Sequence, residues 1–275
     1  WTLDQFLEMN GIPGIERVDT RALTKKIRTQ GVMLGILEVY SKGEEPNIRE
    51  LKREAQSMED PSQRDLVGEV CTREIKRHTG REDCQVVLID CGVKNSILRN
   101  FTSRGVTVIQ VPPNTSSDQI AKLKPDGVVL SNGPGDPKRV KDVIRTVKSL
   151  IELRTPLFGI CLGAQILALA LGGDTFKLKF GHRGQNHPCL ELKTGRCYIS
   201  SQNHGYAIDP ESLSETGLEV TYVNANDRTV EAIEHRDLPV FATQWHPEGS
   251  PGPNDTNFMF DKFMAMMKDA KKALR

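Results

Sequence analysis

One short stretch of this sequence sets a cysteine between two glycines, in the order Gly159-Ile160-Cys161-Leu162-Gly163. It follows an apolar run and precedes a helix-like segment, so it has the form of a nucleophile elbow with a thiol in place of a hydroxyl. A helix that begins here brings backbone N–H groups close to the sulfur, and their partial positive charge favours the thiolate. An isolated cysteine is more often buried and inert, but this setting favours a nucleophile. The N–H of Leu162 is expected to face an oxyanion formed by attack on a carbonyl.

A cysteine nucleophile needs a base, and the sequence offers six histidines: His78, His182, His187, His204, His235 and His246. We select His246 because it directly follows an apolar, strand-like run, 240–242. Glu248, two residues later, can orient the imidazole through a hydrogen bond, which completes a set of nucleophile, base and orienting group. His-Pro-Glu alone is a weak signal, but together with the elbow it predicts a catalytic site.

A second glycine-rich segment, Gly133-Pro134-Gly135, follows another apolar run. It could be a simple turn or a phosphate-binding loop. It lacks both the Gly-Lys-Ser/Thr of a P-loop and the spacing of a dinucleotide-binding motif. We therefore favour a loop whose backbone lines the pocket of an acyl substrate.

The composition limits the classes of protein to consider. The chain has 275 residues, of which 37% are hydrophobic and 27% charged, and its formal net charge is +1. These values are typical of a soluble globular protein and give no general attraction to nucleic acid or to a membrane. Six cysteines without a CxxC pair indicate free thiols in a reducing compartment, the cytoplasm, and we expect no metal site.

The elements that must position these residues alternate along the chain. Short apolar runs typical of buried parallel strands lie at 86–90, 106–111, 127–131 and 157–160, and helix-like segments follow at 94–103, 117–123, 140–153 and 164–171. This alternation predicts an α/β domain with a doubly wound, mostly parallel sheet. In such sheets, functional groups gather at the carboxyl ends of the strands, where both glycine-rich segments lie.

The remaining regions have different sequence patterns. From residue 176 onward the pattern is rich in strands, and a final helix is expected over 257–272. The first part, residues 1–75, is charged and is expected to form a partial α+β domain with a strand over 32–40. Residues 76–84 form our candidate linker, and residues 85–275 the catalytic domain.

Taken together, the motifs GICLG, SNGPGDP and WHPE resemble the triad-type glutamine amidotransferases. The stretches GHRGQNHP (181–188), SQNHGYA (201–207), SPGPND (250–255) and VDTRALT (18–24) narrow the resemblance to the glutaminase subunits of carbamoyl-phosphate synthetases. The resemblance covers nearly the whole chain and implies the amidotransferase-like, flavodoxin-like version of the α/β fold.

The resemblance also implies roles for individual residues. Cys161 attacks the side-chain amide of L-glutamine, His246 protonates the departing ammonia and then activates water, and Glu248 holds His246. Gly135 and Leu162 supply oxyanion-hole N–H groups. The positions that match the family's glutamine contacts are Gly133, Gly135, Leu162, Gln165, Asn203, Gly205 and Tyr206.

The implied partner is a large subunit that uses ATP, bicarbonate and Mg²⁺ to convert the ammonia to carbamoyl phosphate for arginine and pyrimidine synthesis. The chain itself is expected to need no cofactor. Two departures from the family pattern stand out. Ala164 occupies a position where a larger polar residue is usual. The chain is also expected to start inside the amino-terminal domain, after a segment that carries a glutamine-contacting serine and part of the large-subunit interface.

Three rival hypotheses remain open at this point. The first is an amidotransferase serving GMP, CTP or anthranilate synthesis, against which residues 1–40 and the GHRGQNHP stretch argue. The second is a non-catalytic scaffold subunit, which the presence of Cys161, His246 and Glu248 disfavours. The third is a cysteine protease or esterase built on a similar elbow.

Overall fold

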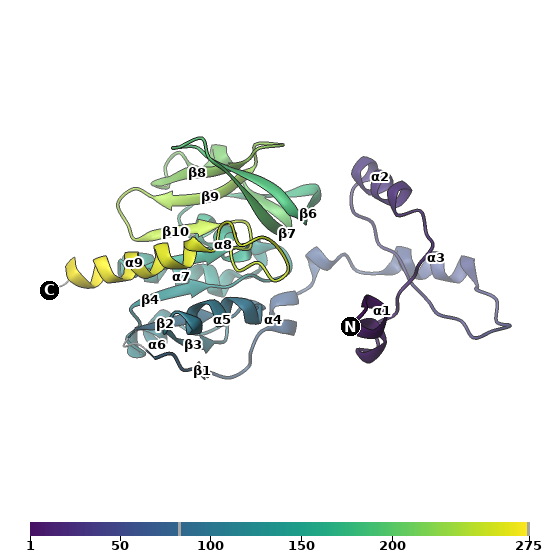
Figure 1. Cartoon of the computed structure of the whole chain (residues 1–275), viewed down its shortest axis with the longest axis horizontal. Coiled ribbons are helices and arrows are strands. Elements are labelled where there is room, and N and C mark those ends of the chain that lie inside the picture. Colours follow the sequence, from purple (N-terminus) through teal and green to yellow (C-terminus); the bar gives the residue numbers. More distant parts are fainter. Residues whose placement is uncertain (82–83, 274–275) are drawn as a thin grey trace. The chain divides into compact units, whose positions relative to one another are not determined.

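The computed structural model describes residues 1–81 and 84–273 of the chain (Figure 1). It divides into two compact units, Trp1–Arg64 and Asp65–Arg275. The division falls earlier than the boundary at residue 75 expected from the sequence. Residues 76–78 of the expected linker form a strand of the second unit, whereas 82 and 83 lie outside the described residues, as do 274 and 275 at the carboxyl end.

The first unit consists of short helices joined by extended chain. They are α1 (Leu3–Met9), α2 (Thr20–Gln30), α3 (Ile48–Ser57) and the 3₁₀ turn η1 (Pro61–Gln63). Each α-helix begins after a polar N-cap, and Asp19 accepts from the N–H of Ala22 at 2.9 Å. No residue of these three helices is buried.

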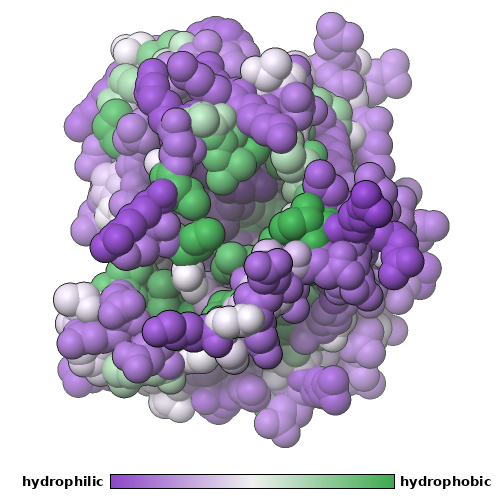
Figure 2. Space-filling model, turned by 90° about the vertical axis from the view of Figure 1, so that its right-hand side faces the viewer, coloured by the Kyte–Doolittle hydropathy of each residue, from purple (hydrophilic) through white to green (hydrophobic). Residues whose placement is uncertain are grey.

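The strand expected over 32–40 is absent from the structure, in which residues 31–40 are neither helical nor paired. A strand needs a neighbouring ladder to satisfy its backbone groups, and no described segment pairs with this one. Val32, Leu37 and Val39 are consequently exposed. Figure 2 shows hydrophobic residues exposed among hydrophilic ones on the face that it draws.

The second unit alternates strands and helices and then becomes mainly β. Its helices are α4 (Leu66–Val70), α5 (Asn95–Ser103), α6 (Ser117–Lys122), α7 (Lys141–Glu152), α8 (Leu162–Ala170) and α9 (Phe258–Ala273), with 3₁₀ turns η2 (Pro137–Arg139) and η3 (Pro210–Leu213). Its strands are β1 (Lys76–His78), β2 (Gln85–Ile89), β3 (Thr107–Val111), β4 (Gly127–Leu130), β5 (Leu157–Ile160), β6 (Thr175–Glu191), β7 (Cys197–Ile208), β8 (Leu218–Asn224), β9 (Val230–His235) and β10 (Val240–Thr243).

These strands form a single sheet in the order β1-β3-β2-β4-β5-β10-β9-β8-β6-β7. The block β3-β2-β4-β5-β10 is parallel, and the α/β class predicted from the sequence is confirmed. The strands from β9 onward extend the sheet in antiparallel pairs. Strand β10 therefore joins the two halves, with β5 on one side and β9 on the other.

Helices cover both faces of the parallel block. Apolar residues of α6, α7 and α8 pack with one set of strand side chains, while α5 and α9 pack with the other. In β4, Val128 and Leu130 point to the first layer and Val129 to the second, as the two-residue period of a strand requires. Both faces are thus buried, which explains the continuous apolar runs in the sequence.

Among the helices of the described ranges, 1–81 and 84–273, none combines the length and the apolar character needed to cross a lipid bilayer.

Candidate active site

Cys161 lies on a sharp turn between β5 and α8. Its backbone has φ 56° and ψ −102°, a left-handed conformation that is strained for a residue with a Cβ, and its N–H donates to the carbonyl of Thr243 at 2.8 Å. Such strain is typical of functional positions. The thiol is almost fully buried, with 3% of the residue exposed.

The two glycines beside the elbow allow its close packing. A Cβ on Gly159 would lie 2.6 Å from the backbone of Gly163, and a Cβ on Gly163 would lie 2.3 Å from the carbonyl oxygen of Leu130. Both contacts are far too short for real atoms. Helix α8 can therefore approach β4 and β5 only because these two residues lack side chains.

His246 reaches this turn from the neighbouring strand. Strands β10 and β5 run parallel, with Thr243 paired to Ile160, so that the residues after both strands emerge at the same edge of the sheet. The N–H of His246 donates to the carbonyl of Ser201 at 2.9 Å, which fixes the loop against β7. His246 and Cys161 line the same cavity.

Glu248 holds the other nitrogen of this imidazole. Its Oε1 lies 2.7 Å from Nδ1 of His246, so Nδ1 carries a proton and donates it to the carboxylate. Nε2 is then left for the thiol. Burial by itself lowers the pKa of His246, but Cys161 and Glu248 outweigh it and raise that pKa from 6.5 to about 10. The arrangement stabilises an imidazolium beside a thiolate.

Lys94 completes the set, and the sequence analysis missed it. Its Nζ lies 2.9 Å from Oε1 of Glu248 and donates to the carbonyl of Gly249 at 2.9 Å. Burial raises the pKa of the Glu248 carboxyl, yet His246 and Lys94 outweigh burial and hold it below its usual value. Lys94 follows β2, far from Glu248 in the chain, and no local spacing signals the contact.

The cavity in front of Cys161 has a volume of about 660 Å³. All seven residues that the sequence analysis assigned to glutamine contact line it, together with Cys161 and His246: Gly133, Gly135, Leu162, Gln165, Asn203, Gly205 and Tyr206. Three segments distant in sequence thus meet at one site. The contact of these seven residues with glutamine stays a prediction.

The loop after β4 forms the wall expected from its glycines. A Cβ on Gly133 would lie 2.2 Å from the carbonyl oxygen of Cys91 and 2.7 Å from Cδ2 of Leu162, and Gly135 has φ 92°. The loop therefore packs against the elbow more closely than any other residue type would allow. Leu162 begins α8, where N–H groups lack partners within the helix and can stabilise an oxyanion.

The opposite wall is strand β7. Gln165 donates through Nε2 to the carbonyl of Tyr206 at 2.9 Å and to Oε1 of Gln244 at 3.0 Å. Nε2 of Gln244 lies 3.7 Å from Sγ of Cys161. Gln244 is fully buried, and the sequence analysis did not select it although it lies two residues before His246.

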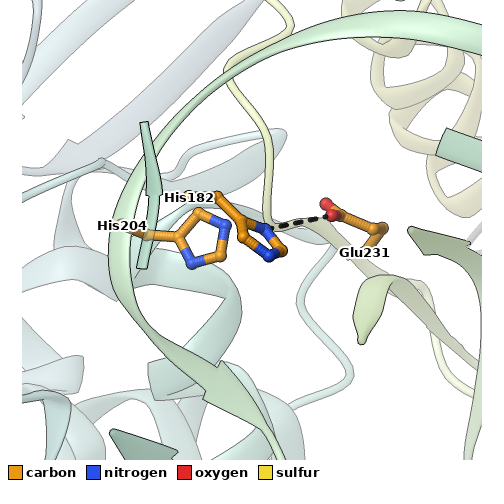
Figure 3. A group of neighbouring side chains, drawn as sticks. All are labelled: His182, His204 and Glu231. Carbon is orange, nitrogen blue, oxygen red and sulfur yellow. Dashed lines mark ion pairs between the residues drawn. The ribbon is translucent and has the colours of Figure 1, made fainter. Parts of the chain in front are cut away.

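A group with the residue types of a metal site lies beside the cavity, and its member His204 is on β7 and lines the cavity. His182, His204 and Glu231 are buried, and each offers a ligand-type atom within 4.8 Å of the others (Figure 3). The sequence analysis did not predict this group, because its members come from three different strands, β6, β7 and β9.

Two family models match parts of this chain. The family model "Glutamine amidotransferase class-I" matches residues 87–266, and the model "Carbamoyl-phosphate synthase small chain, CPSase domain" matches residues 1–37.

Several relatives are similar over almost the whole chain. The carbamoyl phosphate synthase small chain of Methanopyrus kandleri is 53% identical over 98% of this chain and 74% of its own length. Those of Methanocaldococcus jannaschii and Archaeoglobus fulgidus are 51% and 46% identical, each over 98% of this chain and over 75% and 73% of their own lengths.

Solved structures share the fold. A Thermoplasma acidophilum protein described as part of a GMP synthase superimposes with a TM-score of 0.61 at 22% identity, over 72% of this chain and 98% of its own. A glutamine amidotransferase from Thermotoga maritima superimposes with a TM-score of 0.50 at 14% identity, over 69% of this chain and 86% of its own. At these identities the likeness concerns the fold alone.

Proposed function

The chain belongs to the carbamoyl phosphate synthase small-chain family, and from that premise we propose that it hydrolyses L-glutamine with Cys161, His246 and Glu248 and delivers ammonia to a large subunit. The observation that carries this proposal is the buried Glu248–His246 hydrogen bond of 2.7 Å beside the thiol at the strained elbow. It supplies nucleophile, base and orienting group in one cavity.

The first half of the reaction forms a thioester. The thiolate of Cys161 attacks the side-chain carbonyl carbon of glutamine, and its oxygen becomes an oxyanion that the N–H groups of Leu162 and Gly135 stabilise. His246, as imidazolium, gives its proton to the amide nitrogen. The carbon–nitrogen bond breaks, ammonia leaves, and a γ-glutamyl thioester remains on Cys161.

The second half regenerates the enzyme. His246, now neutral, takes a proton from a water molecule, whose oxygen attacks the thioester carbon. The carbon–sulfur bond breaks, glutamate leaves, and His246 again carries the proton beside the thiolate. Glu248 keeps the imidazole in one orientation through both halves, because its carboxylate accepts from Nδ1 throughout.

We further propose that the large subunit consumes the ammonia with bicarbonate and ATP, using Mg²⁺, to make carbamoyl phosphate for arginine and pyrimidine synthesis. The chain needs no cofactor of its own in this scheme. The names of the relatives and the class-I amidotransferase domain support this partnership.

The test measures glutamate release from L-glutamine by the complex of this chain with its large subunit. We expect Cys161→Ala and Cys161→Ser to abolish release while ammonia-dependent carbamoyl phosphate formation continues. Cys197→Ser is the matched control, because Cys197 is an exposed free thiol, and it should leave the rate unchanged. Persistent glutamate release in Cys161→Ala would overturn the mechanism.

Two further measurements separate the rival activities. A chloroketone analogue of glutamine should label Cys161 covalently, whereas ester probes of proteases should not. Carbamoyl phosphate formation from glutamine should require the cognate large subunit, which a synthetase that makes GMP or CTP should not be able to replace.

A further inference from the structure

Arg183 lies on β6 within the stretch GHRGQNHP, whose residues have no role in the proposed mechanism. It is paired with Asn203 in the antiparallel ladder of β6 and β7. Residues directly opposite each other in such a ladder point to the same face of the sheet, and Arg183 and Asn203 both line the cavity in front of Cys161. The register of the two strands thus brings a guanidinium group to the cavity.

Two backbone carbonyls hold this guanidinium group. Nη1 of Arg183 donates to the carbonyl oxygen of His182 at 3.0 Å and also to that of His204. Gly181 makes room for this arrangement, because a Cβ there would lie 2.5 Å from Nη1. The backbone therefore fixes Nη1 and leaves the N–H groups of Nε and Nη2 for another acceptor.

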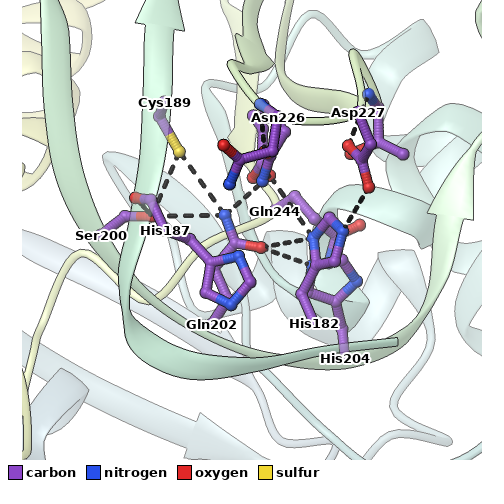
Figure 4. A network of polar contacts seen from close by, with 12 residues as sticks. His182, His187, Cys189, Ser200, Gln202, His204, Asn226, Asp227 and Gln244 are labelled. Atoms are coloured by element: carbon purple, nitrogen blue, oxygen red, sulfur yellow. Dashed lines mark hydrogen bonds and ion pairs between the residues drawn. The ribbon is translucent and has the colours of Figure 1, made fainter. Parts of the chain in front are cut away.

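The side chains of His182 and His204 are themselves tied together by a buried residue. Oε1 of Gln202 lies 2.8 Å from Nδ1 of His182 and 2.9 Å from Nε2 of His204 (Figure 4). Nε2 of Gln202 donates to Oε1 of the buried Glu231 at 2.7 Å. The carbonyls that hold Arg183 thus belong to residues anchored by buried hydrogen bonds, so the guanidinium group is positioned before any ligand binds.

Arg183 is also the one cation of the cavity wall without a carboxylate partner among the described residues. Lys94 and His246, which line the same cavity, are both paired with Glu248. In the described part of the chain, no residue with a carboxylate side chain lines the cavity. An anionic group of a ligand is therefore the partner that Arg183 can take.

L-glutamine carries such a group at the end opposite its reacting amide. In the proposed mechanism, the amide carbonyl lies at Cys161, and the N–H groups of Leu162 and Gly135 surround its oxygen. The methylene groups of the substrate hold its α-carboxylate away from this elbow, where β6 and β7 supply the wall of the cavity. A planar guanidinium group can donate two parallel hydrogen bonds to a carboxylate, which fixes both its position and its orientation.

We propose that Arg183 binds the α-carboxylate of L-glutamine and thereby selects substrates that carry this charge. The inference rests on the proposed glutaminase function and adds one contact to those predicted from the sequence. Arg183 takes no part in the proton transfers at Cys161 and His246. It stabilises the bound substrate and the transition state equally, so its loss should raise KM and leave kcat unchanged.

The test compares L-glutamine with L-glutaminamide, in which an amide replaces the α-carboxylate. Calorimetry measures the binding of each ligand to the complex of the large subunit with the Cys161→Ala chain, which cannot form a thioester. Adding Arg183→Gln keeps an amide donor for the two carbonyls but removes the charge. It should raise the Kd for L-glutamine by about tenfold to 100-fold, the range for a hydrogen bond to a charged group, and leave the Kd for L-glutaminamide unchanged.

Arg196→Gln is the matched control, because Arg196 is an exposed arginine between β6 and β7 that stacks on Tyr198 and does not line the cavity. It should change neither Kd. The proposal is overturned if Arg183→Gln weakens the binding of both ligands equally, or of neither. If Arg183→Gln does not fold, Arg183→Lys replaces it, because an ammonium group cannot form the two parallel bonds. Its loss of affinity must again be confined to L-glutamine.

Steady-state kinetics of the active complex separate substrate binding from a second possible role. The Cys161 thiolate attracts the Arg183 guanidinium and opposes the lowering of its pKa by burial. If Arg183 acted only by stabilising this thiolate, Arg183→Gln would lower kcat for both ligands as substrates, and that result would refute the proposal. Glutamate release that survives Cys161→Ala would instead refute the proposed function, while the two Kd values would still decide the role of Arg183.

Discussion

Replacing Glu248 by glutamine tests the charge of the group that orients His246. The substitution keeps the shape and one hydrogen-bond acceptor for Nδ1 of His246, now 2.7 Å from Oε1 of Glu248, but removes the negative charge. Glu248 is fully buried and does not line the cavity, so the change leaves the substrate's surroundings intact.

The size of the effect follows from the distance. Two unit charges about 4 Å apart interact by about 4 kcal/mol at the effective dielectric constant of about 20 that suits protein sites. At about 1.4 kcal/mol per tenfold, losing this attraction lowers the population of the thiolate–imidazolium pair by about 10³-fold. Lys94 acts in the same direction, because it loses its carboxylate partner and remains a cation near the imidazolium.

The assay is steady-state glutamate release by the complex with the large subunit. We expect kcat/KM of Glu248→Gln to fall about 10³-fold with little change in KM. Glu234→Gln is the control, because Glu234 is half-exposed and pairs with Lys262. Glu248 also raises the pKa of His246, so its loss should move the alkaline limit of kcat/KM, at which the imidazolium that donates to the departing nitrogen loses its proton, to lower pH. A loss of activity below about tenfold would refute the electrostatic reasoning.

Two further predictions concern the elbow. Gly163→Ala should lower the free energy of unfolding by about 1–3 kcal/mol, because its Cβ would lie 2.3 Å from the carbonyl oxygen of Leu130. Gly35→Ala is the control, because a Cβ on Gly35 would have nothing within 4 Å. Equal stabilities of the two variants in chemical denaturation would contradict the close packing around Gly163. Cys161→Gly should be at least as stable as Cys161→Ala, since relief of the strain at φ 56° is worth about 1–3 kcal/mol against about 0.5–1 kcal/mol for the added flexibility of glycine. Ala164→Gly is the comparison inside helix α8, where glycine should be less stable than alanine. If Cys161→Gly were likewise less stable than Cys161→Ala, the turn at Cys161 would not be strained.

The parallel half of the fold could be read from the sequence because its strands are buried on both faces. Runs such as 86–90 and 157–160 leave little alternative to a central strand, and the elbow follows directly from the second. The position of His246 could be predicted for the same reason, because β10 is also a short apolar run.

The antiparallel half was harder to predict, because β6 and β7 are long and rich in polar residues. Strand β6 spans 17 residues and includes Gly181, Gly184 and Pro188, which locally favour turns. They are held in the sheet by pairing with β7, across two register shifts. Such pairing between distant strands cannot be predicted from local sequence patterns.

The same limit explains the residues that were missed. Lys94 meets Glu248, and Glu231 meets His182 and His204, only after distant strands are brought together. Conversely, residues 32–40 have the composition of a strand but no described partner, and they stay unpaired. A propensity becomes a strand only when a neighbouring backbone completes its hydrogen bonds.

The place of β10 in the sheet determines when Cys161 and His246 come together during protein synthesis and folding. Cys161 and the strand that carries it are made early, but His246 lies after β10, which can dock only when both β5 and β9 are available. A nascent or partly folded chain therefore holds Cys161 without its base. In the proposed mechanism, Cys161 therefore gains its base only when the two halves of the sheet have joined.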